Sequence, residues 1–411
     1  MEGQKSVEMK RVYLLNPLSV KEISACFRSL SVHPEGIGIM SKKSAFYTFR
    51  VRSLSSPAAN ILKQEALAAG AELATAWRVI KAADAETDAL LTGTYRQVEI
   101  IVQKIRSQQF GLPCIAAELE SAIRNLFIPR PYLEYRGSRL DLATGPKIMG
   151  IVNVTPDSFS DGGRFFSTDA AVGHGMELCE QGADVLDIGG ESTRPGSRPV
   201  DAAEEKRRVV PVIERLRQRT NTPISIDTRK SEVAKAALDS GADIVNDISA
   251  LTYDSRMTGV VRRYGAGVVM MHMKGTPKTM QKAPAYDDVI ADILSFLEQR
   301  TDDALQKGID RGHIVVDPGI GFGKTPEHNL SILKHMKAFR ALGFPLLVGV
   351  SRKSFIGKLT GAGVEGRSYG SVAAAVWAAA NGADIVRVHD VKETRQALLT
   401  VRHIMDARCT Y

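Results

Sequence analysis

Polar side chains directly follow several short apolar runs in the later part of the sequence, and their types suit a flat, polar ligand. Asp227, Asn246 and Asp317 each come at the end of such a run. Two carboxylates and an amide can accept from, and donate to, a heterocycle that carries amino and ring N–H groups. Because an unpaired buried polar group costs about 1–3 kcal/mol, a set of this kind discriminates strongly between ligands.

Other strand-like runs are followed by cationic side chains or amides that suit an anion and its counter-ion. Arg194, Arg387 and His389 are donors for an anion such as phosphate or diphosphate. Asn153 offers a carbonyl oxygen to a hard cation such as Mg²⁺, which also takes phosphate oxygens and keeps several waters. One amide is a poor metal site alone, so this ligation depends on bound phosphates. A loop-anchoring role for Asn153 is the alternative.

From Lys147 onward, strand-like runs alternate with amphipathic helical stretches, which predicts parallel strands joined by helices. The predicted strands are Ile148–Val154, Val185–Gly189, Ile224–Asp227, Ile244–Ile248, Val268–His272, Ile314–Asp317, Leu346–Val350 and Ile385–Val388. Eight strand–helix units in about 260 residues favour a (β/α)8 TIM barrel, in which the strand ends meet at one mouth. An open doubly wound sheet is less favoured because the dinucleotide glycine fingerprint is missing.

The predicted helices of this region often end in a Gly-Ala phrase before the next strand, where the Gly supplies a left-handed cap. Examples of the helices are Ala202–Arg219, Glu232–Ser240, Asp288–Gln306, Glu327–Ala341 and Tyr369–Ala380. The loops Thr155–Phe166 and Ser192–Val200 are rich in Gly, Pro and Ser and are candidate lids; plain surface connections are the alternative. The phrase GIGFGK at 319–324 fails the phosphate-loop spacing. Phe322 within it is a candidate wall for an aromatic ligand, or a core residue.

Residues 1–146 lack the regular alternation of strand-like and helical stretches that is found from Lys147 onward. We predict strands at Arg11–Leu15 and Ala45–Val51 and helices at Ala58–Leu73 and Tyr95–Gln108. This indicates a smaller α/β domain at 1–125, a linker or docking segment at 126–146, and the barrel at 147–411. The N-terminal domain has no nucleotide loop, metal cluster or nucleophile motif, so packing or oligomerisation is favoured over a second active site.

The composition is that of an ordinary globular protein, with 44% hydrophobic and 24% charged residues in a chain of 411. The net charge of +8 suits anionic small molecules, and no basic block or helix-turn-helix pattern favours nucleic acid. The four cysteines are scattered, which predicts reduced thiols. The first residues lack a signal-peptide core, and no apolar run approaches the ~20 residues of a membrane span. We therefore expect a cytoplasmic protein without a membrane partner.

Seven phrases of the sequence together resemble dihydropteroate synthase, a pterin-binding TIM-barrel family. They are MGIVNVTPDSFSDGG at 149–163, DIGGESTRPG at 187–196, SIDTRK at 225–230, VNDIS at 245–249, DPGIGFGK at 317–324, GVSRKSFIG at 349–357 and RVHDV at 387–391. They occur in the family's order, and the resemblance covers about residues 147–408. The N-terminal domain looks like the extension of longer members. Departures such as Arg229 and Ile320 alter no residue with an assigned role.

The resemblance implies a transferase of folate biosynthesis that condenses (7,8-dihydropterin-6-yl)methyl diphosphate with 4-aminobenzoate, giving 7,8-dihydropteroate and diphosphate. Mg²⁺ is the implied cofactor, and Asn153 matches its ligand. Asp227, Asn246, Asp317 and Lys353 match pterin-pocket positions. Arg387 and His389 match diphosphate-binding positions. Thr193, Pro195, Phe322, Lys353 and Ser354 match positions around the aminobenzoate, and Arg194 is a further substrate-binding candidate. Sulfonamides, which mimic aminobenzoate, are the implied inhibitors, and a homodimer is expected.

The implied chemistry is SN1-like, with Asp227, Lys353 and Arg387 as the catalytic residues. Diphosphate leaves with Mg²⁺ assistance, and the aromatic amine attacks the resulting pterin-stabilised cation. Two rival functions are a methyltetrahydrofolate-dependent methyl transferase and a non-catalytic pterin-binding or regulatory protein. The SRKS and RVHD phrases favour the synthase over the first rival, and the complete set of polar strand ends argues against the second. Residues 1–125 could add a scaffold or partner-binding role.

Overall fold

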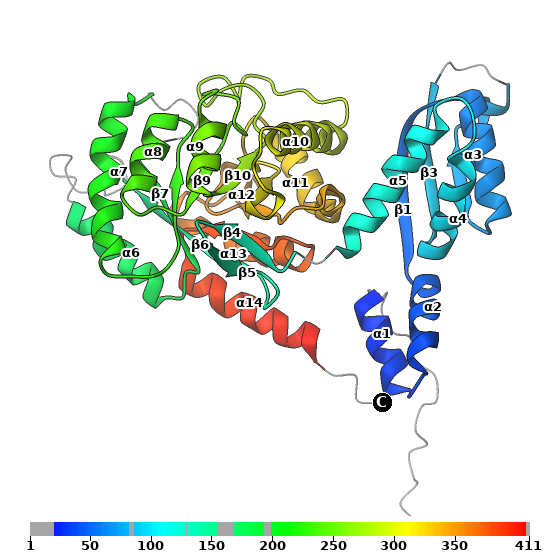
Figure 1. Ribbon diagram of the computed structural model, residues 1–411, viewed down its shortest axis with the longest axis horizontal. Coiled ribbons are helices and arrows are strands. Elements are labelled where there is room, and N and C mark those ends of the chain that lie inside the picture. Colours follow the sequence, from blue (N-terminus) through cyan, green and yellow to red (C-terminus); the bar gives the residue numbers. More distant parts are fainter. Residues whose placement is uncertain (1–19, 82–85, 129, 155–167, 193–198, 408–411) are drawn as a thin grey trace, which may run out of the picture. The chain divides into compact units, whose positions relative to one another are not determined.

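The computed structural model describes residues 20–81, 86–128, 130–154, 168–192 and 199–407 (Figure 1). The chain forms two compact units, one built from the residues before Asn125 and the other from Asn125–Ala407. Each unit has its own apolar core. Within the described parts of the chain, none of the helices is long and apolar enough to cross a membrane.

The N-terminal unit is a three-stranded antiparallel sheet, in the order β1-β3-β2, with helices packed on it. Its elements are α1 (Val20–Ser29), α2 (Pro34–Ser44), β1 (Phe46–Ser55), α3 (Ser56–Ala68), β2 (Glu72–Thr75), the short 3-10 helix η1 (Trp77–Lys81), β3 (Glu86–Thr94), α4 (Tyr95–Ile105) and α5 (Leu112–Phe127). The sheet forms because alternate side chains of β1, such as Val51, are buried while Arg50 and Arg52 are exposed. A capping box between Thr94 and Gln97 begins α4.

Most predictions for this unit hold where the structure describes them. The strand predicted at Ala45–Val51 is present as β1, which extends to Ser55. The helix predicted at Tyr95–Gln108 begins at Tyr95 as predicted and ends at Ile105, three residues early. The helix predicted at Ala58–Leu73 is wrong at its end: α3 stops at Ala68, Gly70 has a φ of 74°, and Leu73 lies in β2. The glycine takes the left-handed conformation that ends a helix. The strand predicted at Arg11–Leu15 lies outside the described residues.

The second unit is the predicted barrel (Figure 1). Its eight parallel strands lie in the order β11-β10-β9-β8-β7-β6-β13-β12. A parallel bridge between Val316 and Leu346 closes the ring. The strands are β6 (Lys147–Asn153), β7 (Val185–Gly189), β8 (Ile224–Asp227), β9 (Ile244–Asp247), β10 (Gly267–Met271), β11 (Ile314–Asp317), β12 (Leu347–Gly349) and β13 (Ile385–Val388). All eight match the predicted strands to within one residue at every end.

Helices surround this ring, as the alternating pattern predicts. They are α6 (Thr168–Glu180), α7 (Ala202–Arg217), α8 (Ser231–Asp239), α9 (Met257–Tyr264), α10 (Val289–Gln306), α11 (Pro326–Lys334), α12 (Ser354–Thr360), α13 (Ser368–Ala380) and α14 (Val391–Asp406), with 3-10 helices η3 (Arg311–His313), η4 (Met336–Leu342) and η5 (Glu365–Arg367). The helix predicted at Glu327–Ala341 is wrong as one element, because the chain breaks at His335 into α11 and η4.

The Gly-Ala-Asp phrases form a repeated clamp at the amino ends of the strands. Gly182, Gly241 and Gly382 have φ values of 96°, 108° and 109°, which confirms the left-handed caps. The Asp of each phrase accepts the backbone N–H of a neighbouring strand and pairs with an arginine that also donates to the glycine carbonyl. The three clamps are Asp184 with Ile148 and Arg395, Asp243 with Ile224 and Arg217, and Asp384 with Leu346 and Arg340.

A hairpin of β4 (Tyr132–Tyr135) and β5 (Ser138–Asp141) covers the bottom of the barrel. Its apolar residues Leu133 and Leu140 pack with the lowest inward-facing layer of the strands, which includes Met149, Val185 and Ile385. The barrel interior is therefore a packed core at this end, and ligand-sized space has to come from the opposite end.

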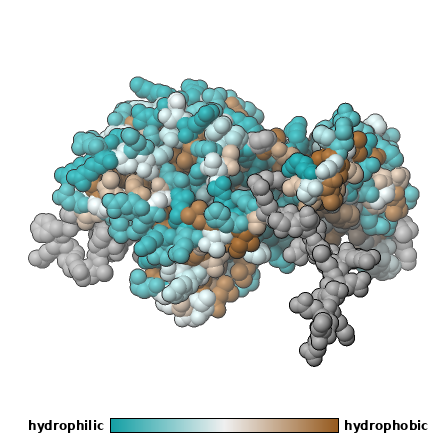
Figure 2. Space-filling model, turned by 90° about the horizontal axis from the view of Figure 1, so that it is seen from below, coloured by the Kyte–Doolittle hydropathy of each residue, from teal (hydrophilic) through white to brown (hydrophobic). Residues whose placement is uncertain are grey.

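The face of the molecule seen in Figure 2 is mainly hydrophilic, with separate apolar patches. Large apolar side chains are exposed on the last three helices of the barrel unit. They are Leu359 on α12, Tyr369 and Trp377 on α13, and Leu399, Ile404 and Met405 on α14. Exposed apolar groups that gather on neighbouring helices are typical of an interface.

Candidate active site

The strand register places three of the predicted site residues, together with a glycine, in one row at the carboxyl end of the barrel. Asn153 on β6 pairs with Gly189 on β7, Gly189 pairs with Asp227 on β8, and Asp227 pairs with Asn246 on β9. Gly189 contributes no side chain to this row. A Cβ there would lie 3.8 Å from the Asn153 Oδ1 and 3.9 Å from the Asp227 Oδ2. The glycine therefore leaves an opening between the amide and the carboxylate.

Arg387, from β13, reaches across the barrel to this row. Its Nη2 donates to the Asp227 Oδ2 at 2.7 Å, and its Nε donates to the Asp187 Oδ2 at 2.6 Å. The same Asp187 oxygen accepts from the Asn246 Nδ2 at 3.1 Å. Asp187 is completely buried, and it joins two predicted site residues. Sequence reasoning missed Asp187; the available signal was an acid inside the apolar strand VLDIG.

The charged groups of this cluster perturb one another because they are buried together. Burial raises the pKa of Asp227 to about 7; Arg387 opposes the rise and Asp187 adds to it. Burial also raises the pKa of Asp317, against the charge of Lys353. In turn, burial lowers the pKa of Lys353 to about 8, against the charge of Asp317. Burial among other charges thus shifts the pKa values of Asp227 and Lys353 toward neutrality, which is common for groups that do chemistry.

The turn after β11 is shaped by three glycines. Gly319, Gly321 and Gly323 have φ values of 69°, 82° and 63°, where other residues are strained. A Cβ on Gly319 would lie 2.0 Å from the His272 carbonyl oxygen, so the turn passes directly over the end of β10. The turn places the Phe322 ring below Lys353, whose Nζ lies 4.5 Å from the ring centroid.

A buried lysine fastens this turn to the end of β10. The Lys324 Nζ donates to the His272 Nδ1 at 2.9 Å and to the Phe322 carbonyl at 3.0 Å. Burial holds the pKa of His272 down to about 2, so the ring is neutral. The Asp317 Oδ1 accepts from the Gly319 N–H at 2.7 Å. These contacts fix the position of Phe322 before any ligand arrives.

The turn after β12 is tied to the end of β13. Arg352, with a φ of 55°, pairs with Asp390 at 2.6 Å. The Ser351 Oγ accepts from the His389 backbone N–H at 3.2 Å and lies 3.0 Å from the His389 Nδ1. Lys353 therefore follows a constrained residue, and the His389 ring is held by its neighbour. Ser354 is exposed at the start of α12.

The structure brings together Asp227, Asn246, Asp317, Lys353 and Arg387, with Asn153 in the same row and Phe322 against Lys353. Ser354 lines a neighbouring cavity of about 180 Å³, to which Lys324 and Phe355 also contribute. Thr193, Arg194 and Pro195 lie outside the described residues. So do Thr155–Phe166 and most of the second predicted lid.

The groups beside Asn153 determine what kind of metal ion this end of the barrel could hold. Among the described residues, no group of three or more His, Cys, Asp or Glu side chains could hold a metal ion. The Asn153 amide has no hydrogen-bond partner within the described residues, and its Oδ1 faces the opening over Gly189. Mg²⁺ usually binds through one or two protein oxygens, substrate phosphates and water. The residues present therefore fit a metal ion that arrives with a diphosphate, and not a caged resident ion.

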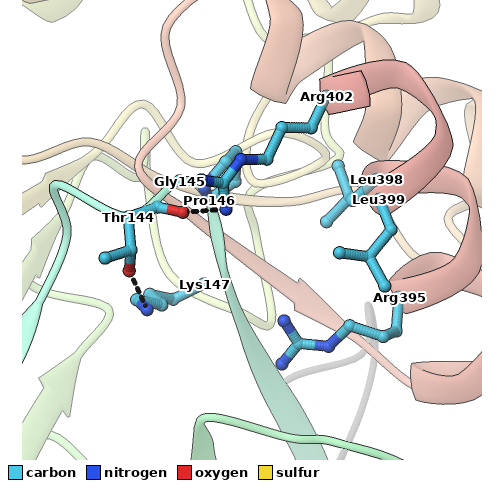
Figure 3. A pocket seen from close by; sticks show the side chains of 8 residues that line it. All are labelled: Thr144, Gly145, Pro146, Lys147, Arg395, Leu398, Leu399 and Arg402. Atoms are coloured by element: carbon cyan, nitrogen blue, oxygen red, sulfur yellow. Dashed lines mark hydrogen bonds between the residues drawn. The ribbon is translucent and has the colours of Figure 1, made fainter. Parts of the chain in front are cut away.

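A second cavity, of about 220 Å³, lies at the amino ends of the strands, away from the predicted site. Figure 3 shows Arg395 and Arg402 of α14 on either side of Leu398 and Leu399, facing the turn before β6. Arg402 donates to the Thr144 carbonyl, and Lys147 donates to the Thr144 hydroxyl. Since Arg395 belongs to the Asp184 clamp, these cations are already used in holding α14 to the barrel.

Comparisons with known proteins match the barrel. Residues 149–389 match a family model described as "Pterin binding enzyme". Over 273 residues the chain is 46% identical to dihydropteroate synthase of Escherichia coli (strain K12), an alignment that covers 66% of this chain and 96% of the relative.

Solved structures give the same result. The chain is similar to Xanthomonas albilineans dihydropteroate synthase with 4-aminobenzoic acid, with 48% identity and a TM-score of 0.64, over 67% of this chain and 99% of that one. It is also similar to the same organism's enzyme in complex with 7,8-dihydropteroate, with 45% identity and a TM-score of 0.61, over 67% of this chain and all of that one.

Proposed function

Because the chain belongs to the dihydropteroate synthase family of pterin-binding enzymes, we propose that its barrel joins a dihydropterin to 4-aminobenzoate. The reaction condenses (7,8-dihydropterin-6-yl)methyl diphosphate with 4-aminobenzoate and releases diphosphate, which makes the chain a transferase of folate biosynthesis. The observation that carries the proposal is the row Asn153–Gly189–Asp227–Asn246, with Arg387 reaching into it from β13.

The pterin is proposed to bind Asp227, Asn246, Asp317 and Lys353. A pterin edge presents an amino group, ring N–H groups and a carbonyl oxygen, and these four side chains offer matching acceptors and donors. One oxygen of Asp227 is taken by Arg387, while its Oδ1 has no hydrogen-bond partner among the described residues. That oxygen is therefore an acceptor for the ligand.

The diphosphate is proposed to bind Arg387 and His389, with Arg194 as a further donor, and Asn153 would hold the accompanying Mg²⁺. When bound, the metal supplies positive charge that stabilises the leaving diphosphate. Arg387 is suited to this place because its guanidinium is held at two of its nitrogens by carboxylates. Little reorganisation is then needed when the leaving group acquires charge.

The aminobenzoate is proposed to bind near Phe322, Lys353 and Ser354, together with Thr193 and Pro195. Support comes from the fixed turn that places the Phe322 ring against Lys353. An aromatic wall and a cation suit a benzoate, which has a flat ring and a negative charge.

The chemical step follows from the charges around the pterin pocket. Loss of diphosphate leaves a cation at the methylene carbon, delocalised into the pterin ring. The buried Asp227 carboxylate favours this positive charge, and the burial that raises its pKa also leaves little solvent to screen the interaction. The aromatic amine then attacks the carbon and loses a proton. Alignment of a weak nucleophile with a short-lived cation accounts for much of the rate.

Three broader features belong to the same proposal. Residues 147–411 are the catalytic barrel, 126–146 the docking segment, and 1–125 a packing or oligomerisation domain. The exposed apolar groups of α12, α13 and α14 support a homodimer, which light scattering would test. Within the described parts of the chain, Cys114 and Cys179 form no disulfide, which supports a cytoplasmic location.

The decisive experiment is to incubate the purified protein with the pterin diphosphate, 4-aminobenzoate and Mg²⁺. We expect 7,8-dihydropteroate and diphosphate in equal amounts, and inhibition by a sulfonamide that competes with aminobenzoate. A methyl transferase or a non-catalytic pterin binder would bind pterin and form no dihydropteroate. Absence of product with intact substrate binding would overturn the proposal.

A further inference from the structure

Asp187 is a buried carboxylate at the centre of the site, and nothing in the reaction as described above requires it. It is fully buried on β7, and one of its oxygens accepts from both Arg387 and Asn246. The other oxygen, Oδ1, is buried without a hydrogen-bond partner among the described residues. A buried charge with half of its acceptor capacity unused is costly, so a protein keeps it where it serves a purpose.

The contacts of Arg387 indicate that purpose. Arginine and carboxylate groups pair best through two parallel N–H···O bonds. Here the guanidinium makes one bond to Asp227 through Nη2 and one bond to Asp187 through Nε. Asp187 therefore competes for the guanidinium and prevents a two-bond pair with Asp227. Without that competition, Arg387 could turn and cover both oxygens of Asp227.

We propose that Asp187 is a positioning residue of the pterin pocket, which turns Arg387 so that the Asp227 Oδ1 stays available to the substrate. The inference rests on the proposed function, because it concerns the pocket that would hold the pterin. Asp187 itself acts through Arg387 and does not contact the reacting atoms.

The bond to Asn246 gives Asp187 a second, smaller part in the same pocket. By accepting from the Asn246 Nδ2, the carboxylate fixes which way the amide points, so that the Asn246 Oδ1 faces away from Asp187. One carboxylate thus sets the orientation of a cation and an amide that come from opposite sides of the ring.

The test uses the full-length protein and a double-mutant cycle. The probe is 6-hydroxymethyl-7,8-dihydropterin, which lacks diphosphate and so reports on the pterin pocket alone, measured by calorimetry. We expect Asp187→Asn to weaken binding about tenfold or more. In an Arg387→Gln background the same change should cost less than about threefold, because the residue through which Asp187 acts is gone. The KM for 4-aminobenzoate should stay unchanged in Asp187→Asn.

Ser225→Ala is the matched control. Ser225 is the register neighbour of Asp187 on β8, is equally buried, and its hydroxyl has no hydrogen-bond partner among the described residues. We expect its probe affinity to equal that of the unaltered protein. An equal loss in Ser225→Ala would show that any change at this depth harms the pocket. A full tenfold loss from Asp187→Asn in the Arg387→Gln background would show that Asp187 does not act through Arg387. Either result overturns the proposal.

Thermal melting identifies variants that do not fold. If Asp187→Asn does not fold, Asp187→Glu replaces it, since it keeps the charge and moves the carboxylate by one methylene. The same loss of probe affinity, and the same dependence on Arg387, is then expected; unchanged affinity would overturn the proposal. Failure of the proposed function looks different: the unaltered protein would make no dihydropteroate, whatever the coupling between Asp187 and Arg387.

Discussion

At the scale of a single residue, the surroundings of Asp227 favour its neutral and its ionised form for different reasons. Its burial favours the neutral acid, while its contact with Arg387 and the proposed cationic intermediate favour the carboxylate. A group held in this way interacts strongly with charge that develops beside it, because little solvent is present to screen the interaction.

We therefore predict that Asp227→Asn lowers turnover by about 10²-fold or more, which is the scale of a lost electrostatic contact in a transition state. The measurement is the rate of dihydropteroate formation at saturating substrates. Asp239→Asn, an exposed acid on α8, is the control and should leave turnover unchanged. Unchanged turnover in Asp227→Asn would remove Asp227 from the mechanism.

The same burial predicts a pH dependence of stability. The pKa of Asp227 is about 7 in the folded protein and near 3.9 in an unfolded chain, so between these values the folded state binds more protons. The free energy of unfolding then falls as pH rises through this window. Between pH 5 and pH 8, Asp227→Asn should gain about 2–3 kcal/mol relative to the unaltered protein. Urea unfolding at both pH values measures this difference, and a constant difference would contradict it.

Asn153 is tested through its effect on metal-dependent binding. We predict that diphosphate binds the protein more tightly with Mg²⁺ than without it, and that Asn153→Ala weakens the Mg²⁺-dependent part about tenfold or more. Calorimetry with and without the metal gives both values. Asn60→Ala, an exposed amide on α3, is the control. Binding that ignores Mg²⁺ would refute the role of Asn153.

At the scale of elements, the turn after β11 is where chain geometry and ligand binding are most closely connected. Its three glycines adopt left-handed conformations, and Gly319 passes within contact of the His272 carbonyl. A side chain there would displace the turn and, with it, the Phe322 ring.

We predict that Gly319→Ala destabilises the protein by more than about 2 kcal/mol and raises the KM for 4-aminobenzoate, because backbone strain and a steric clash add. Thermal melting and steady-state kinetics measure the two effects. Gly361→Ala is the matched control: Gly361 has a φ of 72°, but a Cβ there meets nothing within 4 Å. Gly361→Ala should lower the stability through backbone strain and leave the KM for 4-aminobenzoate unchanged. Equal effects in both variants would mean that the turn tolerates displacement.

The sequence predicted the strands of the barrel better than its turns and helix ends. Apolar runs such as Ile314–Asp317 are buried on both faces, so their composition alone marks them. Asp187 escaped notice because a strand pattern identifies the strand and not the neighbour across the ring. Its partner Arg387 is 200 positions away in the chain. The break between α11 and η4 is likewise set by packing, since no Pro or Gly marks it.

At the scale of the whole molecule, the two units have separate cores, and Asn125 and Arg130 belong to the barrel. The Asn125 Nδ2 donates to the Ala341 carbonyl, and an Arg130 nitrogen donates to the Arg340 carbonyl, both at 2.7 Å. The hairpin β4–β5 covers apolar strand ends. The place to divide the chain is therefore before Asn125.

We predict that a chain beginning at Asn125 folds and forms dihydropteroate within about threefold of the full-length rate, because domains with their own cores fold alone. A chain beginning at Lys147 lacks the hairpin and should aggregate, since it exposes the bottom layer of the barrel. Product formation and solution mass compare the two. Loss of activity in the longer fragment would assign the N-terminal unit a direct part in the reaction.

The Gly-Ala-Asp clamps have a consequence for how the barrel comes apart. Asp184 connects the turn before β7 to β6 and, through Arg395, to α14. The first strand and the last helix of the barrel are therefore held by one hydrogen-bonded cluster. The clamps of Asp243 and Asp384 connect other neighbouring elements of the barrel in the same way. Amide hydrogen exchange at the amino ends of these strands should accordingly require global unfolding. The loops at the carboxyl end, where the proposed active site lies, can then open locally while the amino end stays folded.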